Sequence, residues 1–173
     1  MKLVITGFMG CGKTEVAREL ARRLELEVVD LDEAIIKREG RSPAQLIIED
    51  GEAAFRSVES EVLRALLETE AEGVIALGGG AWIQEANRGL IRQYGWLSVW
   101  LDVPLDVCWA RIEGSVEDRP LAKTREQAQA LFDLRQPIYE LADIQVKTLE
   151  ELIDRITGVT GFARLNPANP ETS

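Results

Sequence analysis

The fold of this chain is decided by the stretch Gly7-Phe8-Met9-Gly10-Cys11-Gly12-Lys13-Thr14. The apolar run at residues 3–6 precedes it and predicts a buried strand, while residues 15–24 repeat apolar side chains at helical spacing. A strand, the spacing Gly-x-x-x-x-Gly-Lys-Thr and a helix, in this order, are typical of a P-loop. The other interpretation, a glycine-rich turn that ends in Lys-Thr by chance, does not account for the flanking strand and helix.

The chemistry of phosphate binding explains the residues of this stretch. Glycine lets the backbone curl so that several N–H groups point at one anion, and the start of a helix adds partial positive charge. The Lys13 ammonium can reach the terminal phosphates of a nucleotide, and the Thr14 hydroxyl can bind Mg²⁺. We expect Lys13 to be solvated until it pairs with phosphate.

Composition narrows the classes of function. The 173 residues include 46% hydrophobic and 29% charged side chains, which is typical of one globular domain with a sizeable core. The formal net charge of −10 argues against a nucleic acid as partner. The chain has no histidine, so a general base has to be a carboxylate or a lysine. A metal site is expected to use oxygen ligands, which suits Mg²⁺.

Three features of the sequence bear on its compartment. No apolar run approaches the roughly 20 residues that a membrane helix needs. Met1 leads almost directly into the first predicted strand, so we expect no signal peptide. Cys11 in the phosphate loop and Cys108 in a helical pattern are expected to be free thiols in a reducing compartment. We therefore predict a cytoplasmic monomer that binds small molecules and has no membrane partner.

Strands and helices alternate along the rest of the chain. Further strands are predicted at residues 27–30, 73–77, 96–101 and 144–146. Helices are predicted at residues 33–39, from 43, from 52, and at 83–94, 104–112, 124–135 and 148–158. This alternation predicts one α/β domain at residues 1–160, with a parallel sheet and helices on both faces. Residues 161–173 are expected to be a frayed tail.

Two further motifs directly follow predicted strands, as the P-loop does, and ligands of such sheets lie beyond the carboxyl ends of the strands. In Asp30-Leu31-Asp32, one acid can hold the Mg²⁺ shell and the other can contact a substrate hydroxyl. The alternative is a solvated helix start, where acids are favoured. Gly78-Gly79-Gly80 can be a tight turn, but three glycines cost backbone entropy, so we prefer a backbone that closely approaches a ligand.

Arginines are the other candidate ligands of a small anion. Arg56 lies on the margin of the apolar stripe of a long predicted helix, and Arg135 lies just before Pro137. The guanidinium fork suits a planar carboxylate. Either arginine can equally be a solvated surface residue, because the chain has 20 lysines and arginines.

Together these residues resemble the shikimate kinase family over about residues 3–156. The motifs that carry the resemblance are Gly7 to Thr14, Asp30-Leu31-Asp32-Glu33-Ala34-Ile35, Asp50-Gly51-Glu52 with Phe55-Arg56, Gly78-Gly79-Gly80, Arg119-Pro120-Leu121 and Arg135-Gln136-Pro137-Ile138-Tyr139. The resemblance implies a three-layer P-loop kinase fold with a five-stranded parallel sheet in the order 2-3-1-4-5. It also implies a shikimate-binding segment at about residues 31–62 and a lid at about 113–123.

The resemblance further implies transfer of the γ-phosphoryl group of ATP, with Mg²⁺, to the 3-hydroxyl of shikimate. The products are shikimate 3-phosphate and ADP, in the biosynthesis of chorismate and aromatic amino acids. The resemblance implies catalytic roles for Lys13, Asp32 and Arg119, and metal binding by Thr14 and Asp30. The nucleotide-binding residues that it implies are Gly10, Cys11, Gly12, Lys13, Thr14, Glu15, Arg111 and Arg119. The substrate-binding residues that it implies are Asp32, Arg56, Gly79, Gly80 and Arg135, with Glu59 supporting a substrate arginine.

Three other functions stay open on the sequence. The nearest is a kinase of another small metabolite, such as gluconate. A nucleoside monophosphate kinase has no obvious use for the triple glycine. A nucleotide-binding protein without phosphotransfer activity does not need Lys13, Thr14, Asp32 and Arg119 together. A panel of acceptor substrates separates these functions.

Overall fold

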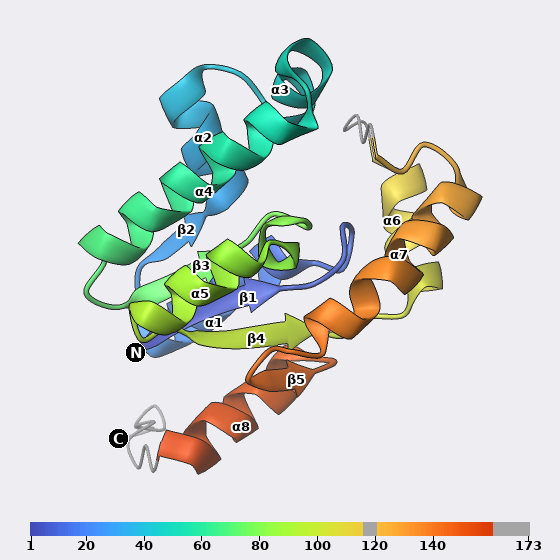
Figure 1. Ribbon diagram of the computed structural model, residues 1–173. Coiled ribbons are helices and arrows are strands. Elements are labelled where there is room, and N and C mark those ends of the chain that lie inside the picture. The colour runs from blue at the N-terminus through green and yellow to red at the C-terminus, as the bar shows by residue number, and fades with distance from the viewer. Residues whose placement is uncertain (116–120, 161–173) are drawn as a thin grey trace, which may run out of the picture.

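The computed structural model describes residues 1–115 and 121–160, which form a parallel sheet flanked by helices (Figure 1). The strands are β1 (Lys2–Thr6), β2 (Val28–Asp30), β3 (Gly73–Ala76), β4 (Leu97–Leu101) and β5 (Ile144–Val146). They lie in the order β2-β3-β1-β4-β5, and every neighbouring pair is parallel. The predicted fold class and strand order are therefore confirmed.

The central strand is β1, because its side chains are apolar on both faces. Leu3, Val4 and Ile5 are fully buried, and Val4 pairs with Ile75 of β3 on one side and with Ser98 of β4 on the other. A strand of this kind is stable only where helices cover both faces of the sheet. Burial of β1 therefore fixes the position of the loop that follows it, at the carboxyl edge of the sheet.

The helices cover both faces because the chain crosses the sheet in both directions. They are α1 (Lys13–Leu24), α2 (Leu31–Glu39), α3 (Pro43–Asp50), α4 (Glu52–Thr69), the 3₁₀ turn η1 (Ala81–Ile83), α5 (Glu85–Gln93), α6 (Leu105–Glu113), α7 (Arg125–Tyr139) and α8 (Leu149–Thr160). The chain passes from β1 to β2 in one direction and from β3 to β4 in the other, so right-handed crossovers place α1 and α5 on opposite faces. Figure 1 shows α4 and α5 on the face toward the viewer.

Short polar residues set the starts of the helices that frame the site. The Asp30 carboxylate accepts the backbone N–H groups of Asp32 and Glu33, which caps α2. A capping box begins α3, with the Ser42 and Gln45 side chains each accepting the backbone N–H of the other residue. These caps hold α2 and α3 beyond the sheet, above the loop that follows β1 (Figure 1).

The helix predicted at residues 83–94 is two elements in the structure, η1 followed by α5. Side chains of α5 donate to the carbonyl groups of η1, which in a continuous helix would accept backbone N–H groups instead. Asn87 donates to the Ala81 carbonyl over 2.9 Å, and Arg88 donates to the Trp82 carbonyl over 2.7 Å. The turn after the triple glycine is therefore tied to the start of α5.

The predicted end of α7 near Arg135 is wrong, because the helix continues through Pro137 to Tyr139. Proline removes one helical hydrogen bond, a loss that tertiary contacts can offset. Here the Ile138 carbonyl accepts the Trp82 indole N–H over 2.8 Å, and Tyr139 is 1% exposed. The other predicted elements agree with the structure to within two residues.

Two predicted features lie partly or wholly outside the described residues. Arg119 and the middle of the predicted lid fall at residues 116–120, and the predicted tail falls at 161–173. Within residues 1–115 and 121–160, no helix combines the length and the apolar character needed to cross a membrane.

Candidate functional site

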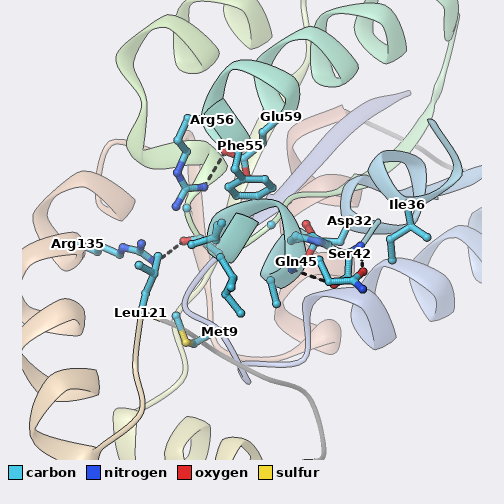
Figure 2. A pocket seen from close by; sticks show the side chains of 17 residues that line it. Met9, Asp32, Ile36, Ser42, Gln45, Phe55, Arg56, Glu59, Leu121 and Arg135 are labelled. Carbon is cyan, nitrogen blue, oxygen red and sulfur yellow. Dashed lines mark hydrogen bonds and ion pairs between the residues drawn. The ribbon is translucent and has the colours of Figure 1, made fainter. Parts of the chain in front are cut away.

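A pocket of about 510 Å³ lies at the carboxyl edge of the sheet, between α2, α3 and α4 on one side and Leu121 and Arg135 on the other (Figure 2). Its lining includes Met9 of the P-loop and the triple glycine that follows β3. It also includes Asp32, Arg56, Gly79, Gly80 and Arg135, which are all the substrate-binding residues that the sequence predicts. The fold therefore brings these five residues together from four separate parts of the chain.

Arg56 is held by acidic residues of its own helix. Its Nη1 donates to Glu59 Oε2 over 2.8 Å, and its Nη2 donates to Glu52 Oε1 over 3.2 Å. Glu59 Oε2 also accepts the Gln84 side-chain amide over 3.2 Å. Burial raises the pKa of the Glu59 carboxyl above its ordinary value, against the opposing effect of the Arg56 guanidinium. The ion pair thus holds the Arg56 guanidinium in one direction. That Glu59 supports a substrate-binding arginine stays a prediction.

Arg135 reaches the same pocket from α7. Its side chain is 5% exposed, and its Nη1 donates to the Gly79 carbonyl over 3.1 Å. In Figure 2, Arg135 and Arg56 come from different helices, while Asp32 lies on the other side of the pocket. Two guanidinium groups with fixed directions and one carboxylate therefore face a single space.

The triple glycine brings the backbone close to three functional groups. A Cβ on Gly78 would lie 2.7 Å from Asp32 Oδ1, and a Cβ on Gly79 would lie 3.3 Å from the Met9 nitrogen. A Cβ on Gly80 would lie 2.6 Å from Arg56 Cζ. Any larger residue would displace these groups, so glycine is required here by neighbouring parts of the protein. The close approach to a ligand stays a prediction.

Lys13 is partly buried and pairs with the P-loop itself, contrary to the expectation that it is solvated until it meets phosphate. Its Nζ donates to the carbonyls of Gly7 and Phe8 over 3.0 and 2.9 Å, and it lies 3.8 Å from Cys11 Sγ. The loop curls around the first turn of α1, so its carbonyl groups are the acceptors nearest to the ammonium. The helix start itself has no side-chain cap at Gly12, which leaves backbone N–H groups for an anion.

Thr14 and Asp30 are joined across the start of α1. The Thr14 hydroxyl donates to Asp30 Oδ2 over 2.6 Å, while Asp30 Oδ1 caps α2. The pair offers a hydroxyl and a carboxylate oxygen beside the P-loop, and Mg²⁺ binds one or two carboxylates together with substrate phosphates. The donor set therefore fits this metal.

Two other predicted nucleotide-binding residues lie at the rim of the P-loop. Arg111 Nη1 donates to the Gly10 carbonyl over 3.2 Å. A Cβ on Gly12 would lie 3.1 Å from Arg111 Nη1 and 3.5 Å from Glu15 Oε2. The arginine of α6 and the acid of α1 thus flank the same loop, and Arg119 lies outside the described residues.

Sequence reasoning missed the apolar wall of the pocket. Ile36 and Ile48 line it although they are 43% and 63% exposed, and Phe55 lines it although the sequence places it in a helical core stripe. Exposed isoleucines on short helices can indicate a binding site, because contact with the ring of a ligand is more favourable for them than contact with water. Gln84 was also missed, since nothing in its local pattern links it to Glu59.

The chain matches the family model described as shikimate kinase over residues 9–158. A curated relative, shikimate kinase of Cereibacter sphaeroides, is 41% identical over 157 residues, covering 89% of this chain and 77% of the relative. The shikimate kinase of Ruegeria pomeroyi is 40% identical over 162 residues, covering 89% and 82%. The match thus includes the P-loop from Met9 onward and every element of the pocket.

A solved structure agrees with this match. The structure of shikimate kinase from Acinetobacter baumannii in complex with shikimate has a TM-score of 0.80 and 30% identity. It covers 95% of this chain, which covers 94% of that structure. The similarity therefore extends over the fold as a whole and is not limited to the P-loop.

Proposed function

Because this chain belongs to the shikimate kinase family, an ATP-dependent kinase family that acts on an alcohol group of shikimate, we propose that its pocket holds shikimate beside the P-loop. The observation that carries the proposal is the convergence of Arg56, Arg135 and Asp32 on one pocket at the carboxyl edge of the sheet. Shikimate has a carboxylate at one side of its ring and hydroxyls at the other. The pocket offers guanidinium groups for the first and a carboxylate for the second.

Arg56 and Arg135 bind the shikimate carboxylate. Each uses some of its N–H groups on the protein, Arg56 on Glu59 and Glu52 and Arg135 on Gly79, so its direction is set before substrate arrives. A guanidinium has five N–H donors, and the remaining ones suit the two oxygens of a carboxylate. The backbone at Gly79 and Gly80 allows the ring to lie close to Arg56.

Asp32 acts on the 3-hydroxyl of shikimate. Its carboxylate lies against Gly78 at the start of α2, so its position is fixed by the same triple glycine that receives the ring. In a loose phosphoryl-transfer transition state the protein works mainly by positioning and by charge neutralisation. Asp32 therefore orients the hydroxyl toward the γ-phosphate and accepts its proton.

The P-loop and its rim bind ATP. Residues Gly10 to Thr14 supply backbone N–H groups, and Lys13 leaves the loop carbonyls to neutralise charge on the phosphates. Arg111 and Glu15 lie beside the same loop, and Arg119 closes over the phosphates from the lid. Closure of the lid excludes water, which limits wasteful hydrolysis of ATP.

Thr14 and Asp30 hold Mg²⁺. When bound, this ion neutralises charge that develops on the phosphate oxygens. The hydrogen bond between the two side chains, 2.6 Å long, supports the assignment because it already places both oxygens beside the P-loop.

The enzyme acts as a monomer in the cytoplasm, without nucleic acid or membrane partners. Cys11 and Cys108 are both free thiols, which supports a reducing compartment. The large apolar side chains that are exposed in the described residues are Ile36, Ile48, Val107, Leu134 and Leu141, and two of them line the pocket. Only three of these exposed apolar side chains lie outside the pocket, which is few for a subunit interface. Sedimentation velocity tests this state.

A coupled assay of ADP release tests the function. Shikimate should increase the rate well above the slow hydrolysis of ATP alone, and gluconate or a nucleoside monophosphate should not. NMR of the product should then show the new phosphate ester at the 3-hydroxyl. Equal stimulation by gluconate would point to a kinase of another metabolite, and no stimulation by any acceptor would mean that the chain only binds nucleotide.

A further inference from the structure

Tyr139, the last residue of α7, is more closely tied to the pocket than its position in the sequence indicates. Its hydroxyl donates to the Gly79 carbonyl over 2.6 Å. Its ring is 1% exposed and stacks on Trp100 of β4, with ring centroids 6.1 Å apart and planes 20° apart. The ring is therefore held on the sheet, and its hydroxyl has one fixed direction.

The Gly79 carbonyl accepts from two side chains of α7. Tyr139 donates over 2.6 Å and Arg135 Nη1 over 3.1 Å, so both lone pairs of the oxygen are used. Without the Tyr139 hydroxyl, one lone pair of this partly buried carbonyl would lose its partner, which is unfavourable. If the Tyr139 hydroxyl were removed, Arg135 would be a donor close enough to take its place, since it already bonds to this carbonyl. A second N–H of its guanidinium would then turn toward Gly79 and away from the pocket.

The same bond also fixes the backbone of the triple glycine. The peptide that joins Gly79 to Gly80 is trans, so its N–H points away from the carbonyl that Tyr139 holds. On its other side, the Gly79 Cα faces the P-loop, where a Cβ would come 3.3 Å from the Met9 nitrogen. One peptide group is thus fixed between α7 and the P-loop.

A purely structural role does not require this hydroxyl. The Trp82 indole N–H already joins the end of α7 to η1 through the Ile138 carbonyl, over 2.8 Å. Burial raises the pKa of the Tyr139 phenol above its ordinary value, so the hydroxyl stays a neutral donor at any pH used in an assay. The group is therefore suited to holding a neighbour in place and not to proton transfer.

We propose that Tyr139 is a positioning residue for the acceptor substrate, which acts by occupying the Gly79 carbonyl so that Arg135 presents its free N–H groups to the shikimate carboxylate. This inference rests on the proposed function, in which Arg135 binds that carboxylate. It assigns a role to the tyrosine at the end of the Arg135-Gln136-Pro137-Ile138-Tyr139 motif.

The variant Tyr139→Phe keeps the buried ring and removes only the hydroxyl. We expect KM for shikimate to rise about 3- to 30-fold, which is the range for the loss of one hydrogen bond. KM for ATP should change less than about twofold, because the Tyr139 hydroxyl donates to Gly79, which lines the acceptor pocket. Tyr94→Phe is the matched control, since it removes the only other tyrosine hydroxyl of the chain, which donates to Glu68 at the surface over 2.6 Å. It should change neither KM.

A double-variant cycle with Arg135→Lys separates positioning from stability. If Tyr139 acts through the guanidinium fork, Tyr139→Phe should raise KM for shikimate in the wild type but change it less than about twofold in the Arg135→Lys background. Two outcomes would overturn the inference: a lower melting temperature of Tyr139→Phe with unchanged KM, or an equal effect of Tyr139→Phe on KM in both backgrounds. In either case the proposed function would stand if Arg135→Lys alone still raised KM for shikimate. If Arg135→Lys alone left KM unchanged, the carboxylate-binding role of Arg135 would fail, and the inference with it.

Discussion

Arg56 donates to Glu59 over 2.8 Å, and the acceptor of this ion pair is more deeply buried than the donor. The side chain of Glu59 is 1% exposed and that of Arg56 is 16% exposed. A carboxylate at this depth is costly unless it is paired, so Arg56 is needed to keep Glu59 charged. Glu59 in turn fixes one edge of the guanidinium and leaves the rest for the pocket. Stability and the proposed binding of substrate therefore involve the same two side chains.

The first prediction concerns the pH dependence of this pair. Burial raises the pKa of Glu59 above its ordinary value of 4.5, and Arg56, Gln84 and Arg135 oppose the shift. In the unfolded chain the carboxyl ionises near 4.5, while in the folded protein it keeps its proton to higher pH. As pH rises through this interval the unfolded state loses the proton first and becomes relatively more favourable.

The free energy of unfolding of the wild type should therefore fall relative to that of Glu59→Gln as pH increases from 4.5. Above the folded pKa of Glu59 the difference should become constant. Urea denaturation of both proteins at a series of pH values measures it. A difference that grows in favour of the wild type over the same interval would mean that the pKa of Glu59 is lowered in the folded protein.

The fold could be predicted from the sequence because its signals are local. The strand and helix on either side of the P-loop, the helix start at residue 43 and the alternation of apolar runs each depend on residues a few positions apart, and all are confirmed. The extension of α7 to Tyr139 could not be predicted in this way. It depends on Trp82 and Gly79, which lie more than 50 residues from their partners in the sequence.

Sequence reasoning selected candidate site residues by their type, such as arginine, aspartate and lysine, which have strong chemical preferences. The residues that it missed do not show such a preference in their local sequence. Gln84 became visible only when the fold placed its amide beside Glu59. The solvated state expected for Lys13 was wrong because backbone carbonyls, which carry no sequence signal, are its nearest acceptors. Arg88 likewise belongs to none of the predicted motifs, yet its guanidinium donates to two carbonyls of η1.

The second prediction concerns the close approach at Gly80. A methyl group there would lie 2.6 Å from Arg56 Cζ, so Gly80→Ala should displace the guanidinium and raise KM for shikimate about tenfold or more. Gly89→Ala, in the middle of α5, is the control, because a Cβ there meets nothing within 4 Å. It should leave KM unchanged and stabilise the protein by about 0.5–1 kcal/mol. Similar KM values for both variants would contradict the proposed position of the substrate.

The third prediction concerns Lys13. Lys13→Ala should lower kcat by about 10²–10³, which is typical for one lost electrostatic donor to a reacting group. Because Nζ also donates to the Gly7 and Phe8 carbonyls, a small decrease in melting temperature should accompany it. Lys37→Ala, at an exposed position of α2, should change neither quantity. Turnover close to that of the wild type at saturating ATP would refute the role of Lys13.

The fourth prediction separates the two aspartates. Asparagine can still cap α2, so Asp30→Asn should keep the helix start and lose mainly the charge that binds Mg²⁺. The Mg²⁺ concentration for half-maximal rate should rise, and excess Mg²⁺ should partly restore turnover. Asp32→Asn should raise KM for shikimate and slow transfer, without rescue by Mg²⁺. A loss of about 10²–10⁴ in rate would indicate a true base, and a smaller loss would indicate an orienting role.

A Mg²⁺ titration of both variants at saturating ATP and shikimate makes the comparison. Rescue of Asp32→Asn but not of Asp30→Asn would reverse the two roles. Equal rescue would mean that both carboxylates belong to the metal shell.

The last prediction concerns the carboxylate that Arg56 and Arg135 bind. Lysine keeps the charge of either residue and loses the fork, so each Arg→Lys variant should raise KM for shikimate about ten- to a hundredfold. Arg92→Lys, at an exposed position in the last turn of α5, is the matched control and should change nothing.

The most direct test compares shikimate with its methyl ester, which keeps the ring and hydroxyls and lacks the negative charge. The measurement is kcat/KM for both compounds with the wild type, Arg56→Lys and Arg135→Lys. We expect the wild type to prefer shikimate by about a hundredfold or more, and each variant to lose this preference through slower reaction of shikimate alone. A wild type that phosphorylates the ester as well as the acid, or variants that slow both compounds equally, would contradict binding of the carboxylate by these two arginines.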